Sequence, residues 1–364
     1  MVNKTPQTHA ISSNPPYRTA IKQYFDWQNT SIKVSLAARG ILAINGIIFS
    51  SPLLCASGLL IGSFSLAMRY FSQVPQRSFQ NDLDEMQKNG YICSQKKTDN
   101  KKIFIETCAA FSRGHYQTAT GRTVRLNAAL QIKMERDSRV YSSIRPSDFK
   151  PNPRYQTQIT VENLSTLRMT EKLLNQGLNP LVLDMANRYT AGGGVRYGAN
   201  AQEEILCRQS NLMRALAKLE SQNKYPIPEL GGIYVPGVQF FRADPSEGYA
   251  FLESPLTASV FASAAYDCGS DRPADDIIYQ RNTKEKIRTV LLAALKHGHD
   301  SVVLSAFGCG AFHNDPRLIA TLYKEVFAEP KFKGRFKKIS FGIIEDHNSR
   351  RNNFNTFKTI LCRS

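Results

Sequence analysis

The fold is decided by residues 181–212, which read LVLDMANRYTAGGGVRYGANAQEEILCRQSNL. This stretch starts with an apolar run at 181–185, which is typical of a buried strand. Three glycines, 192–194, follow, and the segment from Gln202 onward is typical of a helix. Strand, glycine-rich loop and helix in this order predict an α/β protein, in which ligands bind beyond the carboxyl ends of the strands.

Apolar strands alternate with helices on either side of this segment. Ser165 is the expected N-cap of one helix, and Gly298 is expected to end another. Such alternation predicts a three-layer α/β/α fold with a mixed, mainly parallel sheet. The expected strands are 158–162, 181–185, 233–241 (one strand or a pair), 259–265, 301–306 and 338–344, and the expected helices are 165–175, 283–296 and 318–327.

The chain divides into three predicted segments. Residues 1–80 form a polar arm and a hydrophobic stretch, 81–150 a helical accessory region, and 151–364 the α/β domain. In the accessory region, 104–111 is a helix candidate and 115–122 (HYQTATGR) predicts a turn or short hairpin. Prolines at 146, 151 and 153 mark a connector before the domain.

No charged residue occurs between Arg39 and Arg69. The run 40–68 is long for one membrane span and short for two, and Pro52 interrupts it. It allows one tilted span, a re-entrant hairpin with Pro52 at its tip, or a hairpin buried in a soluble protein. Basic residues on both flanks favour the re-entrant hairpin with both ends cytosolic. We therefore expect a cytosolic α/β domain that is membrane-associated through 40–68, with a soluble cytoplasmic protein as the alternative.

The overall composition is that of a globular protein with a large positive charge. Its 364 residues include 47 Lys and Arg against 30 Asp and Glu, a net charge of +17 at pH 7. This surplus favours a polyanionic or phosphate-rich partner, although a basic protein without one is the plain alternative. The 7 cysteines are odd in number and form no CxxC pair, which argues against a disulfide framework and a zinc site. We predict a reducing compartment and no structural metal.

Two adjacent carboxylates, Glu203 and Glu204, follow the first glycine-rich loop and are a candidate acid/base pair. The alternative is that they only favour the dipole of the helix that they begin. A second loop, 307–316 (FGCGAFHNDP), follows strand 301–306, and its small residues suit backbone amides directed at a diphosphate.

Other features have two readings each. In the second loop Cys309 is a packed small residue or a nucleophile. Tyr189 and Tyr197 beside the first loop are stacking residues or plain loop residues, and Asp346-His347 reaches the site or forms a surface turn. The basic run 331–338 guides a polyanion or is a solvated face.

Together the two loops resemble the macrodomain-type poly(ADP-ribose) glycohydrolases, in particular their microbial class. The resemblance rests on the glycine triplet 192–194, a gap of seven residues, and Gln202-Glu203-Glu204. It extends to IYVPGVQFFR (233–242), VLSAFGCGAFHNDP (303–316) and FGIIEDHNS (341–349), and so to roughly 100–362. It implies a bacterial protein with a macrodomain-like catalytic domain over 151–364.

The resemblance also implies roles for single residues. Glu204 falls on the catalytic acid and Glu203 on the residue that holds the ribose hydroxyls. Two positions depart from the family pattern, Asp184 where an asparagine is expected and Ala191 where a proline often stands. The implied substrate-binding residues are Asn187, Gly192, Gly193, Gly194, Gln202, Gly308, Cys309, Gly310, Ala311 and Phe312.

The chemistry agrees with this assignment. Most glycosidases use two opposed carboxylates, but neighbouring residues on one helical turn cannot oppose each other across a sugar. One glutamate should therefore transfer protons while the other positions the substrate. The predicted function is hydrolysis of ADP-ribose linkages, above all the ribose–ribose O-glycosidic bond of poly(ADP-ribose) on modified proteins.

This reaction needs no metal or cofactor, and no sequence-specific nucleic acid is expected as partner. Two alternative functions remain open: a hydrolase of mono-ADP-ribosylated proteins, and a non-catalytic ADP-ribose-binding module. A module that only binds has no need of an acid, so the presence of both Glu203 and Glu204 argues against it.

Overall fold

The computed structural model describes residues 41–44, 47–50, 95–145, 150, 152–345 and 352–362. The chain forms two compact units, 1–92 and 93–364. In the first unit, β1 (Ile41–Ile44) and β2 (Ile47–Ser50) pair antiparallel. Both strands lie within the uncharged run, and the predicted turn at Pro52 lies outside the described residues.

Membrane association finds no support in the described residues. Among them, no helix combines the length and the apolar character that crossing a bilayer requires. The rest of the run 40–68 lies outside the described residues, as do Asp346 and His347.

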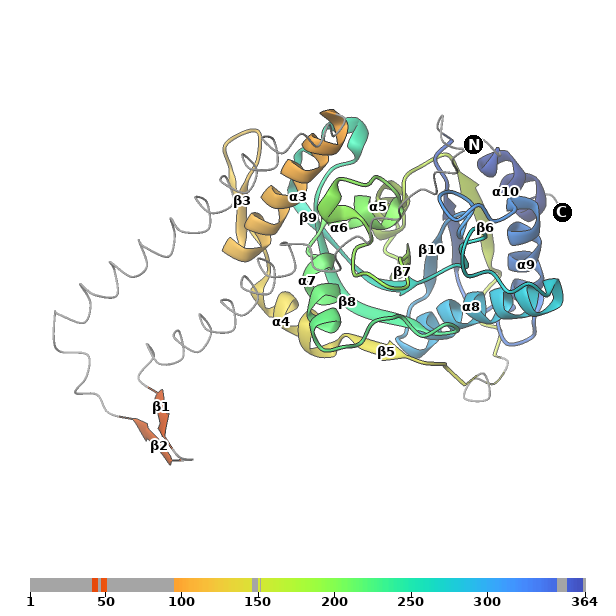
Figure 1. Ribbon diagram of the computed structural model, residues 1–364, viewed down its shortest axis with the longest axis horizontal. Coiled ribbons are helices and arrows are strands. Elements are labelled where there is room, and N and C mark those ends of the chain that lie inside the picture. The colour runs from red at the N-terminus through yellow and green to blue at the C-terminus, as the bar shows by residue number, and fades with distance from the viewer. Residues whose placement is uncertain are drawn as a thin grey trace, which may run out of the picture. The chain divides into compact units, whose positions relative to one another are not determined.

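The second unit is built on a sheet of seven strands in the order β5-β8-β9-β7-β10-β11-β6 (Figure 1). The five strands from β9 to β6 run parallel, whereas β8 is antiparallel to both of its neighbours, β5 and β9. The predicted mixed, mainly parallel sheet is therefore confirmed. The strands are β5 (Arg139–Tyr141), β6 (Gln158–Glu162), β7 (Pro180–Met185), β8 (Gly232–Arg242), β9 (Phe251–Ser263), β10 (Ser301–Leu304) and β11 (Lys338–Gly342).

Helices cover this sheet. Three of them, α8 (Asp276–Lys296), α9 (Pro316–Ala328) and α10 (Asn353–Cys362), share one buried apolar cluster with Leu181 and Leu183 of β7. Because side chains alternate along a strand, Val182 and Asp184 face the other way. The remaining helices of the domain are α5 (Thr166–Asn175), α6 (Gln202–Gln209) and α7 (Leu212–Ser221), with 3₁₀ turns η3 (Val195–Tyr197) and η4 (Pro245–Glu247).

Local sequence explains where several helices begin. The Ser165 hydroxyl accepts a hydrogen bond from the Arg168 amide at 3.0 Å, which confirms it as the N-cap of α5. Asp275 caps α8 in the same way, so this helix starts seven residues before the predicted Thr283. Asp315 caps α9, and a proline occupies the first helical position, where no amide hydrogen is needed.

The accessory segment is less helical than predicted. It contains α3 (Gln95–Arg113) and α4 (Ala128–Asp137), but β3 (His115–Gln117) and β4 (Thr123–Arg125) form the expected short hairpin between them. Its last element, β5, then pairs with β8 at the edge of the main sheet. The accessory segment is thus continuous with the domain sheet.

Candidate active site

Glu203 lies in the first turn of α6 with only 2% of its surface exposed. Its Oε2 accepts a hydrogen bond from the Asn187 amide at 2.7 Å, and its Oε1 accepts one from the Gly192 amide at 3.0 Å. Both donors belong to the loop that follows β7. The distance in sequence between the glycines and the glutamates therefore allows the loop to fold back onto α6, so that its amides reach the Glu203 side chain.

Glu204 is held by the same loop from the other side. Its Oε1 accepts a hydrogen bond from the Gly194 amide at 2.8 Å, and its Oε2 accepts one from the Ala201 amide at 2.9 Å. Glu204 is 7% exposed, so it lies nearer to the solvent than Glu203. The two candidate residues thus meet at one place, and each has both carboxyl oxygens fixed by backbone amides.

Gly193 passes directly over this pair. It has a φ of +53°, a conformation that favours glycine, and a Cβ at this position would lie 2.5 Å from Glu204 Oε1 and 3.0 Å from Glu203 Oε2. The amides of residues 191–195 are all bonded to acceptors within the protein. The first loop therefore uses its amides to hold the glutamates, and a ligand here would meet carboxylate oxygens.

Helix α6 is anchored at both ends. At its start, Gln202 Oε1 accepts from the Met185 amide at 2.8 Å, and its Nε2 donates to the Leu183 carbonyl at 2.7 Å. These bonds direct the Gln202 amide into the protein interior, against β7. The resemblance implied a substrate-binding role for this residue, and its contacts show it joining α6 to the sheet.

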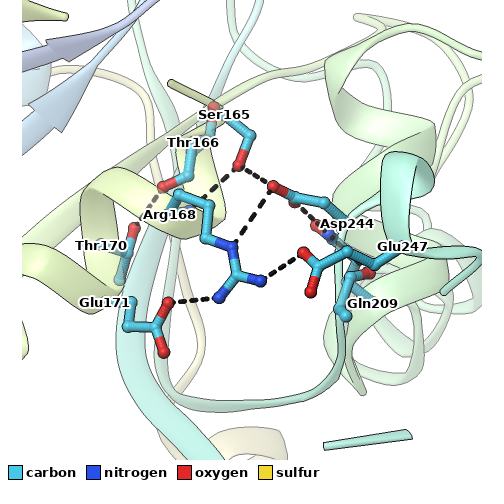
Figure 2. A network of polar contacts seen from close by, with 9 residues as sticks. Ser165, Thr166, Arg168, Thr170, Glu171, Gln209, Asp244 and Glu247 are labelled. Carbon is cyan, nitrogen blue, oxygen red and sulfur yellow. Dashed lines mark hydrogen bonds and ion pairs between the residues drawn. The ribbon is translucent and has the colours of Figure 1, made fainter. Parts of the chain in front are cut away.

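The end of α6 is tied to α5 through the polar network in Figure 2. Gln209 Nε2 donates to Asp244 Oδ1 at 2.8 Å, and the Ser165 hydroxyl donates to the other oxygen of Asp244 at 2.6 Å. Arg168 completes the network by pairing with Glu171 and Glu247. The network fixes the direction of α6, and with it the positions of the two glutamates.

Helix α3 of the accessory segment closes the loop between the glycines and α6. Asn100 Nδ2 donates to the Gly198 carbonyl at 3.1 Å, and a Cβ at Gly198 would lie 2.3 Å from the Lys97 carbonyl oxygen. The Thr107 hydroxyl donates to the Arg208 carbonyl at 2.7 Å. Sequence analysis missed these supporting residues, because no local pattern links α3 to a loop about one hundred positions away.

Asp184 brings a third carboxyl to this region. Its side chain is fully buried at the end of β7, and neither oxygen has a hydrogen-bond partner among the described residues. Burial, together with the nearby charge of Glu204, raises the pKa of Asp184 to about 8. Burial and the proximity of Asp184 also raise the pKa of Glu203 well above its ordinary value. The site therefore disfavours full ionisation of these carboxyls.

The second glycine-rich loop follows β10 and is shaped by Asn314. The buried Asn314 Nδ2 donates to the carbonyls of Tyr266 at 2.7 Å and Gly308 at 3.0 Å. Gly308 has a φ of +73°, and a Cβ there would lie 2.5 Å from that same nitrogen. Only glycine fits this close approach of the backbone to the asparagine.

The tip of the second loop has unused amides. In the described part of the chain, the amides of Gly310, Ala311 and Phe312 donate to no protein acceptor. Gly310 and Ala311 are exposed, and a Cβ at Gly310 would meet nothing within 4 Å. Phe312 is half-buried against the core cluster. Successive amides of this kind are suited to an anion such as a diphosphate.

Other predicted residues are less directly placed. Cys309 is buried in the core cluster, which agrees with the packed small residue. The Asn187 side chain accepts from the amides of Tyr189 and Thr190, so it shapes its own loop. The basic run 331–338 leads into β11 and ends at its first residue, so it lies at the edge of the sheet opposite the glutamates, where Lys337 pairs with Asp300 at 2.9 Å.

These features define the class of protein. It is an α/β domain with two glycine-rich loops beyond the carboxyl ends of parallel strands, where open α/β sheets generally bind their ligands. A pair of carboxyl groups in the first turn of α6 accepts hydrogen bonds from the loop after β7, and a loop follows β10 whose tip amides have no protein acceptor among the described residues. Within the described ranges, no group of three or more His, Cys, Asp or Glu side chains is arranged to hold a metal ion.

Comparison with known proteins finds one matching family model and several similar structures. Residues 105–243 match the family model of the microbial-type PARG catalytic domain. The structure resembles poly(ADP-ribose) glycohydrolase (PARG) from Thermomonospora curvata, with a TM-score of 0.65 and 28% identity over 72% of this chain and 99% of that one. The chain is therefore similar to the microbial-type PARG catalytic domain over residues 105–243, and its structure is similar to those of bacterial PARG proteins.

Structures of relatives with ligands are also similar. The Thermomonospora curvata protein bound to the inhibitor ADP-HPD matches with a TM-score of 0.61 and 29% identity, over 71% of this chain and 98% of that one. PARG from Deinococcus radiodurans in complex with ADP-ribose matches with a TM-score of 0.57 and 26% identity, over 65% and 98%. None of the curated proteins matches the chain.

Proposed function

We propose that this protein hydrolyses poly(ADP-ribose) by cutting its ribose–ribose O-glycosidic bonds. The observation that carries the proposal is the pair Glu203 and Glu204, fixed by the amides of the glycine loop at the carboxyl edge of the sheet. The similar structures from Thermomonospora curvata and Deinococcus radiodurans, with ADP-HPD and ADP-ribose bound, support the substrate class.

In this proposal Glu204 transfers the proton. Its carboxyl group protonates the oxygen of the leaving ribose while positive charge develops at the anomeric carbon. The resulting Glu204 carboxylate then takes a proton from the water that attacks that carbon, which returns the enzyme to its starting state. Glu204 is assigned this role because it is the more exposed of the two glutamates, and its oxygens are already held in place.

Glu203 positions the substrate. Its two oxygens accept from Asn187 and Gly192 and keep further lone pairs that ribose hydroxyls can use. The diphosphate then lies at the second loop, where the amides of Gly310, Ala311 and Phe312 have no protein acceptor in the described residues. Hydroxyl groups are thus bound by carboxylates and phosphate groups by amides.

The experiment compares the Glu204→Gln variant with a matched control, Glu325→Gln, which changes an exposed glutamate of α9. We expect Glu204→Gln to lower turnover of protein-free poly(ADP-ribose) by at least about 10²-fold, the usual scale of general acid catalysis. Binding of ADP-ribose should persist in both variants. Near-normal turnover by Glu204→Gln would refute the assignment, and hydrolysis of mono-ADP-ribosylated protein alone would establish the alternative substrate.

A further inference from the structure

Two tyrosines beside the first loop remain outside the roles assigned so far. Tyr189 is 59% exposed and Tyr197 is 48% exposed, and they stand on either side of the glycine triplet 192–194. The third tyrosine with comparable exposure in the described residues is Tyr155, at 37%, which precedes β6. Among the described residues, the two most exposed tyrosines therefore flank, in the sequence, the loop that holds the glutamates.

The backbone beneath Tyr189 is fixed. Asn187 Oδ1 accepts hydrogen bonds from the amides of Tyr189 at 2.9 Å and Thr190 at 3.0 Å. The next amide, of Ala191, donates to Glu220 Oε1 at 3.0 Å. A ligand that stacks on Tyr189 would have little backbone to order, and a preorganised surface binds at a lower entropic cost.

A positive charge accompanies the ring. The Arg188 guanidinium carbon lies 5.6 Å from the centre of the Tyr189 ring, and Arg188 Nε donates to the Ile227 carbonyl at 3.3 Å. Arg188 forms no ion pair with any carboxylate in the ranges that the structure describes. An aromatic ring beside a cation that forms no ion pair suits a ligand that combines a flat base with a phosphate group.

We propose that Tyr189 and Arg188 form a second subsite, which binds the ADP-ribose unit on the leaving side of the bond that is cut. The adenine of that unit stacks on Tyr189, and its phosphate lies near Arg188. This inference rests on the proposed function, because it needs a substrate with two joined units. It predicts that the enzyme binds a chain of ADP-ribose units more tightly than a single ADP-ribose.

The test compares Tyr189→Ala, Tyr189→Phe and the control Tyr155→Ala on protein-free poly(ADP-ribose) of defined length. Stacking on an aromatic side chain contributes enough that we expect kcat/KM for Tyr189→Ala to fall about tenfold. Tyr189→Phe, which keeps the ring, and Tyr155→Ala should stay near the wild-type value. The Kd for free ADP-ribose, measured by calorimetry, should be unchanged in all three variants.

Each other outcome overturns the inference. If the wild-type protein degrades the chain and Tyr189→Ala does so equally well, the second subsite is refuted and the proposed function stands. If Tyr189→Ala weakens the binding of free ADP-ribose by the same factor by which it lowers kcat/KM, Tyr189 belongs to the site of the terminal unit. An equal loss of kcat/KM in Tyr155→Ala would show that the effect is not specific to Tyr189. If the wild-type protein degrades no chain, the proposed function fails, and the inference fails with it.

Discussion

Gly193→Ala is the sharpest test of how the glutamates are held. The added Cβ would lie 2.5 Å from Glu204 Oε1, whereas ordinary contact begins at 3.4 Å, so the oxygen must move by about 0.9 Å (3.4 minus 2.5). Misplacing a catalytic group by about 1 Å can lower the rate by about 10²-fold. We therefore expect kcat on poly(ADP-ribose) to fall by about two orders of magnitude.

Stability should change far less than activity. An alanine in the left-handed region costs about 1–2 kcal/mol, which lowers the Tm of a domain of this size by only a few degrees. The control is Gly298→Ala, at the end of α8, where φ is +73° and a Cβ would meet nothing within 4 Å. It carries the same backbone cost without touching the glutamates. The reasoning is refuted if Gly193→Ala keeps more than a tenth of wild-type kcat, or if Gly298→Ala loses as much.

Three further predictions concern other parts of the chain. Burial lowers the pKa of His299 to about 4, below its unfolded value near 6.5, so its contribution to stability is present above pH 6.5 and is lost as the pH falls towards 4. His299→Gln should therefore reduce the fall in the free energy of unfolding over this range by up to about 3 kcal/mol, and an unchanged pH dependence of that free energy would contradict this. Asn314→Ala removes the hydrogen bonds that shape the second loop, so calorimetry should show at least about tenfold weaker ADP-ribose binding, and equal affinity would exclude this loop from the site. If the run 40–68 attaches the protein to membranes, full-length protein should sediment with membranes and resist extraction by high salt, and recovery in the soluble fraction at low salt would decide for the buried hairpin.

Sequence patterns predicted the centre of the fold well. Strand β6 was predicted with its observed bounds, and Ser165 was identified as a cap, because apolar runs and capping residues act over a few positions. The start of α8 was missed because its first turn exposes Ile277 and Ile278, which hides the apolar periodicity. Strand β5 has three residues and exists only through its pairing with β8, which no local pattern can reveal.

The candidate site was predicted in part. The spacing between the glycines and Glu203-Glu204 drew attention to both glutamates, and the structure brings them together at the loop after β7. It could not reveal that the glycine amides bind these carboxylates, since hydrogen-bond direction depends on how the loop folds back. The buried Asp184 was noticed only as a departure from a family pattern. Its lack of partners follows from burial in the tertiary structure.

The opposite polarity of the two loops has a consequence for inhibitor design. The first loop has its amides bonded within the protein and lies against the acceptor oxygens of Glu203 and Glu204, whereas the second presents donor amides at Gly310–Phe312. A small anionic fragment should therefore be found at the second loop, and a fragment rich in hydroxyl or ammonium groups at the first. Two such fragments, each weak alone, could be joined in one orientation only, so the loops would set the direction of the linked compound.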